Sequence, residues 1–331
     1  MSNSSLYVGL DVGGTTMKAA VVGDDGVPKT HPVVMDTEPE RGQKAGLETM
    51  CETIRRAVAA AKITIDDVTA IGVATPGLMD IGAGLILDPP NLKPWKNVPV
   101  RDHVKNAFGK TTAFQNDANA AAYGEFWVGA GKDASSMVLF TLGTGVGGGI
   151  IIGDWILEGR HSHGGELGHM RIESPTIGRL CGCGHRGCLE AYASATSVVK
   201  RTREELAAYR GSSSLKEYFT ANDDVLTSKL IFDHAAMGDA LSLKIVDDTA
   251  YYLALGANSV MATVDPEMIA IGGGMVAAGE PFLNKVREYL VRFGLPFPSK
   301  SVIVRYARLG SDAGFIGAAG CARMMVKTGK G

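Results

Sequence analysis

The chain has few cysteines and almost no excess charge. It carries 5 cysteines in 331 residues, and its formal net charge is −2 at pH 7. So few cysteines, in an odd number, argue against the disulfide framework of a secreted protein. A charge this close to zero provides no basic surface for nucleic acid or for an anionic membrane. We therefore expect neither of these as a partner.

Long apolar runs and a leader segment are also missing. No stretch approaches the roughly 18–20 consecutive apolar residues that a membrane-spanning helix needs. The first residues, MSNSSLYVGLDVGG, lack the basic region and the apolar run of a secretory signal. We expect a cytoplasmic location. With 45% hydrophobic residues, a chain of this length can bury a sizeable core and can form two domains.

Glycine, by contrast, is plentiful, and it gathers in two segments with the same layout. Residues 6–22 form an apolar run that ends at Asp11, a Gly-Gly-Thr-Thr turn and a second apolar run. Residues 136–152 repeat this layout around another glycine loop. Each segment predicts two strands joined by a tight loop. The repetition predicts two similar lobes with a cleft between them.

The rest of the chain alternates strands with helices, which indicates an α/β fold. Strands are expected at 68–73 and 112–114, and a last buried strand at 268–271, while 84–100 is expected to be mostly loop. The segments expected to be helical are 45–62, a stretch starting at 117, 191–208, 226–236, 238–263, 280–293 and 313–327.

The two glycine loops are candidate phosphate sites, because glycine lets backbone N–H groups approach a ligand and successive N–H groups form a nest for anions. The first loop contains Gly13, Gly14, Thr15 and Thr16, and the second contains Gly143, Thr144 and Gly145. The carboxylate of Asp11 adds a place for Mg²⁺. Tight turns without a ligand are the alternative interpretation.

Two shorter matches to nucleotide motifs fail on their context. Gly143, Gly145 and Gly148 have the spacing of the dinucleotide fingerprint, but that motif must open a helix, and here a strand follows. Residues 109–111 resemble the end of a P-loop, but Val104 stands where that motif needs glycine. The sequence argues against both sites.

Asp117 follows Asn116 at the start of an alanine-rich segment. A helix N-terminus favours an ionised carboxylate by about 0.3–1 kcal/mol. Such a carboxylate can accept the proton of a hydroxyl group, as the catalytic-loop aspartate of kinases does. A simple helix cap is the alternative, because aspartate is among the best capping residues.

Cys181, Cys183 and Cys188 lie close together in the segment RLCGCGHRGCLE. Three thiolates and one histidine form the closed tetrahedral set of a structural zinc site. Spacing does not select the histidine. The candidates are His161, His163, His169 and His185. Reduced free cysteines or a redox pair are the alternative.

Together these motifs resemble the ROK family of sugar kinases, most closely its bacterial glucokinases. The similarity extends over nearly the whole chain, and 164–170 with 181–190 is its most specific part. The other matching segments are 11–18, 74–77, 116–125, 141–149, 271–274 and 309–320. The span from His169 to Cys181 looks slightly longer than in typical members, which we expect to alter only a surface loop.

The resemblance implies a two-lobed actin-like (ribonuclease H-like) ATPase fold with a cleft between the lobes. Residues 1–118 with 312–331 form the small lobe, which holds the first phosphate motif and the C-terminal helix. Residues 119–311 form the large lobe, with the second phosphate motif, the zinc and sugar motif and the adenosine motif.

The resemblance also assigns roles to single residues. Asp117 is the catalytic base. The sugar ligands are Asn116, Asp117, Glu166, His169, Glu190 and Gly77. The ATP and phosphate ligands are Asp11, Gly13, Gly14, Thr15, Thr16, Gly143, Thr144, Gly145, Gly272, Gly273 and Gly274. The metal ligands are His169, Cys181, Cys183 and Cys188. Lys18 is left as a solvated strand residue.

The implied activity is an ATP-dependent hexose kinase with Mg²⁺ and a structural Zn²⁺, which makes glucose 6-phosphate. N-acetylmannosamine, mannose, fructose or another hexose is the alternative acceptor, and polyphosphate the alternative donor. Sugar-sensing repressors of the family carry an N-terminal helix-turn-helix, for which the early first strand leaves no room. We expect a homodimer or a homotetramer.

Overall fold

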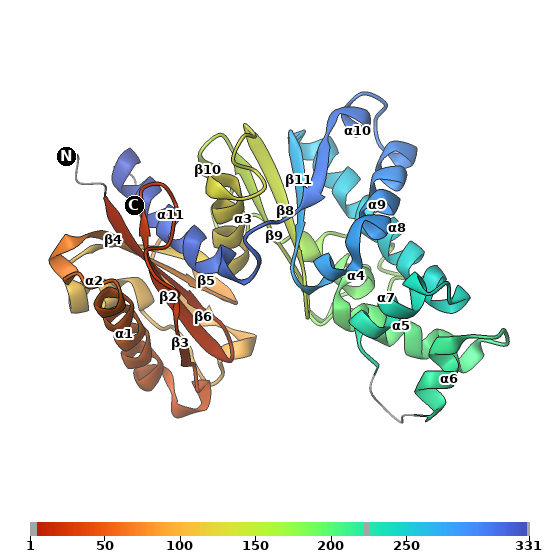
Figure 1. The fold of residues 1–331 in the computed structure, drawn as a ribbon, viewed down its shortest axis with the longest axis horizontal. Coiled ribbons are helices and arrows are strands. Elements are labelled where there is room, and N and C mark those ends of the chain that lie inside the picture. The colour runs from red at the N-terminus through yellow and green to blue at the C-terminus, as the bar shows by residue number, and fades with distance from the viewer. Residues whose placement is uncertain (1–4, 222–225, 330–331) are drawn as a thin grey trace. The chain divides into compact units, whose positions relative to one another are not determined.

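The chain folds into two five-stranded sheets with helices around them (Figure 1). The structure is a computed structural model that describes residues 5–221 and 226–329. Internal contacts divide the chain into two units. Unit 1 comprises Met1–Ala134, Gly149–Gly165 and Arg308–Gly331, and unit 2 comprises Ser135–Gly148 and Glu166–Ala307. The lobe boundaries expected from the sequence stay a prediction.

The strands that form the two sheets and a separate hairpin are β1 Leu6–Val12, β2 Thr16–Gly23, β3 Val33–Asp36, β4 Val68–Thr75, β5 Leu78–Asp80, β6 Leu85–Asp88, β7 Thr111–Asn116, β8 Ser136–Leu142, β9 Val146–Ile152, β10 Trp155–Ile156, β11 Met268–Gly272 and β12 Ile303–Tyr306. The helices are α1 Gln43–Ala60, α2 Val100–Phe108, α3 Asp117–Val128, α4 Glu190–Ala193, α5 Ala195–Ala208, α6 Ser214–Ala221, α7 Ser228–Ala236, α8 Ala240–Val264, α9 Gly279–Phe293, α10 Pro298–Ser301 and α11 Ala313–Thr328.

The two sheets repeat one strand order. The first runs β3-β2-β1-β4-β7, and the second runs β10-β9-β8-β11-β12. In the first sheet β1 is antiparallel to β2 and parallel to β4, which is parallel to β7. In the second sheet β11 is parallel to both β8 and β12. The two predicted strand–loop–strand segments therefore occupy equivalent places, and the α/β prediction is confirmed.

The two faces of the first sheet pack by different means. On one face, apolar side chains of β1 such as Leu10 join Met50 and Ile54 of α1 in a buried core. On the other face, the backbone of β4 at Gly72 packs directly against the backbone of α11. A Cβ at Gly72 would lie only 1.7 Å from the carbonyl oxygen of Ala318. The missing side chain lets the helix backbone approach the sheet closely. This approach places the start of α11 beside β1.

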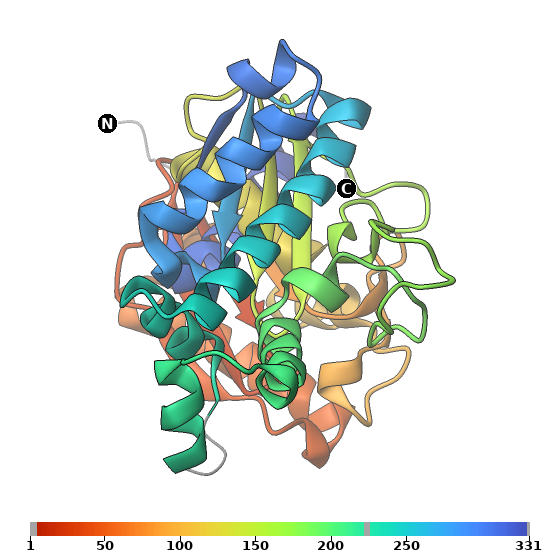
Figure 2. The ribbon, with the colours of Figure 1, turned by 90° about the vertical axis from the view of Figure 1, so that its right-hand side faces the viewer.

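The two longest elements of unit 2 are the helices α8 and α9. Figure 2 shows α8 and α9 side by side in front of the strands. Buried apolar residues recur on α8 at Leu253, Ala257 and Val260, which is the spacing of one helix face. This face accounts for the helix predicted at 238–263.

Several elements differ from those expected. The segment 84–100 is mostly loop, as expected, but it also contains the short strand β6 and buries Trp95 completely, because its apolar side chains complete the core under α1. The buried strand at 268–271 is not the last one, since β12 pairs with it. Ser194 interrupts the helix expected at 191–208, and its side chain caps α5. The helices α2 and α6 were not predicted.

A fully buried carboxylate on α3 holds the segment that leads into α11. Glu125 Oε1 accepts hydrogen bonds from the N–H groups of Arg308 at 2.9 Å and Leu309 at 2.6 Å. Its Oε2 accepts from the N–H group of Ala130 at 2.8 Å. Charge-assisted bonds to backbone donors are among the stronger hydrogen bonds in proteins.

We expect Glu125→Gln to lower the free energy of unfolding by about 2–4 kcal/mol, because the amide loses the negative charge and turns a donor toward backbone N–H groups that the carboxylate accepts from. Urea denaturation measures the change. The exposed Glu48 on α1 supplies the control variant Glu48→Gln. Equal loss of stability in both variants would refute the role of Glu125.

Candidate functional site

The predicted catalytic and phosphate residues of unit 1 lie where parallel strands end. Asp11 of β1 pairs with Ala74 of β4, and Thr75 pairs with Asn116 of β7. The carboxyl ends of these three strands therefore lie in one row across the sheet. In open α/β sheets, ligands bind at this edge.

The first glycine loop is a closed turn between β1 and β2. The N–H group of Gly13 donates to the carbonyl oxygen of Thr16 at 2.8 Å. Thr37 holds the loop through two hydrogen bonds. Its hydroxyl donates to the carbonyl oxygen of Gly13 at 2.7 Å, and its N–H group donates to the carbonyl oxygen of Thr15 at 2.8 Å. The side chains of Thr15 and Thr16 are exposed and can reach a ligand.

Asp11 lies against the first turn of α11, where a Cβ at Gly314 would be 2.2 Å from Asp11 Oδ2. Burial raises the pKa of Asp11 to about 7, the charge of Asp117 raises it as well, and Lys18 opposes both. Lys18 itself is not a solvated strand residue, because its Nζ donates to Ser311 at 3.0 Å and pairs with Asp312 at 3.3 Å. A divalent cation would be the natural partner of two neighbouring carboxylates.

The raised pKa of Asp11 predicts how stability depends on pH. The folded protein binds the proton of this carboxyl more tightly than the unfolded chain, whose pKa is near 3.8. Stability from this group is therefore complete below pH 4 and is lost as the pH rises to about 7, with a total of up to about 4 kcal/mol.

Asp11→Asn should abolish this loss. Urea denaturation of the metal-free proteins at several pH values between 4 and 8 gives the free energy of unfolding of wild type and variant. The difference between the two at each pH is the contribution of Asp11. A difference that does not change with pH in this range would contradict the shifted pKa of Asp11.

Asn116 and Asp117 stand at the junction of β7 and α3. Asn116, not Asp117, is the helix cap: its Oδ1 accepts from the N–H groups of Ala118 at 2.9 Å and Asn119 at 3.2 Å. Asp117 is the first helical residue, and its Oδ1 also accepts from Ala118 at 2.9 Å. Asn116 is thus the N-cap of the helix, and Asp117 is not needed in that role.

The sequence motifs did not indicate that Gln115 and Glu158 hold this junction through hydrogen bonds. Gln115 is buried, and its Oε1 accepts from the N–H group of Asn116 at 2.8 Å, while its Nε2 donates to Glu158 at 2.6 Å. Burial raises the pKa of Glu158, and the bond from Gln115 opposes this. The available signal was a glutamine directly before the Asn116-Asp117 pair. Within the described residues, the buried Oγ1 of Thr75 has no hydrogen-bond partner.

The local backbone and the packing against Pro89 require glycine at position 77. Its φ is 95°, and a Cβ there would lie 2.7 Å from Pro89. Packing thus explains this glycine without a ligand. The role of Gly77 in sugar binding stays a prediction.

The second glycine loop is tied to the cysteine-rich segment by Glu190, the first residue of α4. Glu190 Oε2 accepts from the N–H group of Val146 at 3.1 Å, and its Oε1 lies 3.3 Å from Cys181 Sγ. A Cβ at Gly145 would lie 2.4 Å from Glu190 Oε2. The loop closes through the N–H group of Gly143, which donates to the Gly145 carbonyl oxygen at 3.0 Å.

Gly143 is the position at which a ligand contact can be tested without an internal clash. No atom lies within 4 Å of a Cβ built there, whereas one at Gly145 meets Glu190. If phosphate approaches this backbone, Gly143→Ala should raise the nucleotide KM by roughly ten-fold and leave the sugar KM and the melting temperature unchanged. Steady-state kinetics and a thermal melt measure these. An unchanged nucleotide KM would mean that the loop is only a turn.

The third glycine segment follows β11 at the same edge of the second sheet. Gly272 pairs with Thr141 of β8, so this segment begins beside the second glycine loop. Gly273 has a φ of 85°, and its Cβ would lie 2.4 Å from the carbonyl oxygen of Leu142. Gly274 is exposed, with no atom near a built Cβ. Unit 2 therefore gathers Gly143, Thr144, Gly145 and the segment 272–274.

His169, Cys181, Cys183 and Cys188 form one cluster, with all ligand atoms within 4.8 Å of one another. Cys183 Sγ and Cys188 Sγ are 3.7 Å apart, and Cys181 Sγ lies 3.9 Å from His169 Nδ1. Zn–S bonds of about 2.3 Å in a tetrahedron place sulfurs about 3.8 Å apart, while a disulfide needs about 2 Å. The spacing of the cluster suits zinc, and Cys183 and Cys188 are not joined in a disulfide.

The cluster selects among the four histidines. His169 belongs to it, and the other three do not. His185 is nearest in sequence and its Nδ1 lies 3.8 Å from Cys183 Sγ, but it is not part of the cluster, and its carbonyl oxygen accepts from the N–H group of Cys181 to close the turn. His169 ends a short 3-10 helix after the exposed Glu166, which places both beside the cluster.

The predicted sugar ligands are divided between the units. Gly77, Asn116 and Asp117 belong to unit 1, and Glu166, His169 and Glu190 belong to unit 2. Among the described residues, the helices are too short or too polar to cross a membrane.

Comparison with known proteins finds relatives in the ROK family. A model described as ROK family matches residues 7–324. A glucokinase of Halalkalibacterium halodurans is 36% identical over 313 residues, which cover 94% of this chain and 93% of that protein. A ROK hexokinase from Thermus thermophilus has a TM-score of 0.81 at 32% identity, covering 98% of this chain and 99% of that one.

A ROK family glucokinase from Streptomyces griseus, in complex with glucose and AMPPNP, has a TM-score of 0.76 at 31% identity, covering 97% of this chain and 100% of that one. These similarities confirm the predicted fold class. Relatives with other names match as well. An N-acetylmannosamine kinase of Citrobacter koseri is 29% identical over 94% of this chain, and a putative xylose repressor of a Caldicellulosiruptor species is 28% identical over 86%.

Proposed function

Because the chain belongs to the ROK family, and is similar to its sugar kinases over nearly its whole length, we propose that it transfers the γ-phosphoryl group of ATP to the 6-hydroxyl of glucose. The preference for glucose follows the relatives named glucokinase and the related structure that holds glucose and AMPPNP. The products would be glucose 6-phosphate and ADP.

One observation carries the proposal. The carboxyl edge of the first sheet brings Asp117 close enough to Asp11 for their charges to interact, with the first glycine loop between β1 and β2 beside them. This arrangement puts a candidate base next to a candidate magnesium ligand and a phosphate loop. Phosphoryl transfer needs these parts, since its catalysis is mainly positioning and charge stabilisation.

In the proposed reaction, Asp117 accepts the proton of the 6-hydroxyl while that oxygen attacks the γ-phosphorus. The bond from the γ-phosphorus to the bridging oxygen breaks, and ADP leaves. Asn116 positions Asp117 and offers its side-chain N–H groups to the sugar. The glycine loops at 13–16 and 143–145 bind the phosphates, and 272–274 borders the adenosine. Asp11 would hold Mg²⁺, which supplies charge neutralisation when bound.

The metal cluster serves structure in this proposal. His169, Cys181, Cys183 and Cys188 would hold Zn²⁺ with no open coordination position, as in structural sites. Glu190, in contact with Cys181, is thereby fixed in place, and Glu166 and His169 present their exposed side chains to sugar hydroxyls. We retain the two lobes, 1–118 with 312–331 and 119–311, as the parts that close over the substrates.

A panel of hexoses with ATP and Mg²⁺, followed by coupled detection of ADP, tests the proposal. We expect the highest kcat/KM with glucose. A higher value with N-acetylmannosamine would support the second candidate, for which a named kinase relative is the evidence. Replacing ATP by polyphosphate in the same assay identifies the donor. Absence of ADP release with every hexose would refute the kinase proposal.

A further inference from the structure

A chain of side-chain hydrogen bonds lies behind the Asn116-Asp117 junction. Glu158 Oε1 accepts from Gln115 Nε2 at 2.6 Å. Gln115 Oε1 in turn accepts from the N–H group of Asn116 at 2.8 Å and from Nδ2 of Asn119 at 3.3 Å. All of these residues belong to unit 1. The chain of bonds therefore joins a carboxylate that follows β10 to the end of β7 and the first turn of α3.

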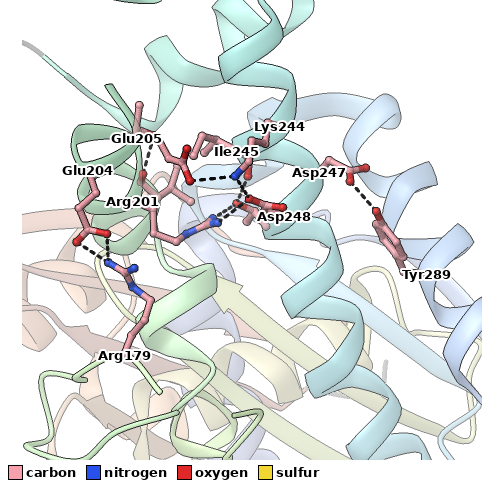
Figure 3. Close-up of polar contacts among 12 residues, drawn as sticks. Arg179, Arg201, Glu204, Glu205, Lys244, Ile245, Asp247, Asp248 and Tyr289 are labelled. Carbon is pink, nitrogen blue, oxygen red and sulfur yellow. Dashed lines mark hydrogen bonds and ion pairs between the residues drawn. The ribbon is translucent and has the colours of Figure 1, made fainter. Parts of the chain in front are cut away.

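Glu158 differs from the carboxylates that join elements in unit 2. Figure 3 shows α5 and α8 joined by Lys244, which donates to Glu205 and to Asp248, both at 3.0 Å. Glu158 is half-buried, and among the described residues no cation pairs with it. The partner of its side chain is the neutral amide of Gln115. A partly buried charge without a counter-charge costs desolvation energy, so this carboxylate is a poor device for stability alone.

The carboxylate does determine which way the Gln115 amide points. An ionised carboxylate only accepts hydrogen bonds, so it draws the NH₂ end of the amide toward itself. The oxygen end then faces the N–H group of Asn116, as the 2.8 Å bond shows. A flipped amide would set donor against donor at Asn116 and acceptor against acceptor at Glu158. Glu158 therefore fixes the backbone at the point where β7 turns into α3, and with it the position of Asp117.

We propose that Glu158 is a positioning residue for phosphoryl transfer, which acts through Gln115 to hold Asp117 where it accepts the sugar proton. This role rests on the proposed function of Asp117 as the base. A misplacement of about 1 Å can lower a rate by as much as about 10²-fold.

The backbone of Glu158 has a separate task. Its carbonyl oxygen accepts from the N–H group of Gly164 at 2.7 Å, which closes the loop ahead of Glu166, a proposed sugar ligand. This bond does not involve the side chain. Substitution of the Glu158 side chain should therefore affect the position of Asp117 while it leaves this loop closed.

Steady-state kinetics of side-chain variants tests the role. Glu158→Leu removes the acceptor and should lower kcat roughly ten-fold, while the KM values for glucose and ATP stay within about two-fold. Glu158→Gln keeps an oxygen that can accept from Gln115 Nε2, so it should retain at least about half of the wild-type kcat. Glu48→Leu, at an exposed position of α1, is the control and should keep the wild-type kcat.

Exchanging the two side chains gives the sharpest test. Gln115→Glu alone points one carboxylate oxygen at another and should lower kcat roughly ten-fold or more. Combined with Glu158→Gln, it restores one donor and one acceptor in reversed order, so the double variant should return to within about three-fold of the wild-type kcat. Failure of the double variant to recover would overturn the pairing as the cause. A loss in Glu158→Gln as large as in Asp117→Asn would also overturn the positioning role.

Hydrogen–deuterium exchange of the segment 111–120 in the full chain tests the same bonds without turnover. Exchange should be faster in Glu158→Leu than in wild type and should return to the wild-type rate in the double variant. Equal exchange in Glu158→Leu and Glu48→Leu would overturn the role of Glu158 even in a protein that is not a kinase. Wild-type turnover that Glu158→Leu leaves unchanged would refute the positioning role alone, whereas the absence of any turnover in wild type would refute the proposed function.

Discussion

Asp117→Asn should lower kcat by roughly 10²–10⁴-fold while sugar affinity stays within a few fold. Asparagine keeps an oxygen that can accept the N–H group of Ala118, as Asp117 Oδ1 does at 2.9 Å. It can also still hydrogen-bond a sugar hydroxyl, but it cannot accept the hydroxyl proton. Initial rates with ATP and glucose, together with glucose binding by calorimetry, measure the two quantities.

The junction itself gives the control for this experiment. Asn116 caps α3 by accepting from both Ala118 and Asn119, so the variant should melt within a few degrees of wild type. Loss of the fold would mean that Asp117 is structural. A variant that keeps more than about a tenth of the wild-type kcat would exclude Asp117 as the base.

Cys188→Ser should remove most of the zinc and raise the sugar KM by roughly ten-fold or more. Cys188 is buried in the cluster, 3.7 Å from Cys183, and a zinc ion bound there would hold the segment that carries Glu190. Structural zinc contributes about 10 kcal/mol or more to folding in small domains, so the melting temperature should fall as well. Metal content by mass spectrometry and both KM values on the folded fraction measure the effect.

The contact of Glu190 with the N–H group of Val146 extends this prediction to the nucleotide. We expect the ATP KM to rise too, but by less than the sugar KM, because Glu190 supports the second glycine loop from one side only.

Two histidine variants provide the matched comparison for the metal. His169→Ala should lose zinc, and His185→Ala should keep it, although His185 is nearer in sequence to the cysteines. Equal loss in both would move the fourth ligand away from His169. Wild-type protein that is fully active without any metal would refute the structural role of the cluster.

Much of the fold follows from local sequence. Apolar runs around Gly13-Gly14 and Gly143 specify strands and tight loops, because strand period and positive-φ turns depend on a few neighbouring residues. Both hairpins were predicted, and both lie at the centre of their sheets. The prolines of 84–100 correctly indicate a segment that is mostly loop, but they do not show that Trp95 and its apolar neighbours are buried by residues distant in sequence.

Some features of the candidate site also follow from the sequence, and others follow only from the tertiary structure. The sequence by itself determined the family, the three cysteines and the Asn116-Asp117 pair, since motifs of this kind are read at fixed spacing. Only the tertiary structure decided that His169 rather than His185 joins the cluster, that Asn116 caps α3, and that Lys18 reaches Ser311 across the chain. The cap of α3 is a local matter of which of two adjacent residues begins the helix. The contacts of His169 and Lys18 depend on distances between residues farther apart in sequence, and such distances exist only once the chain has packed.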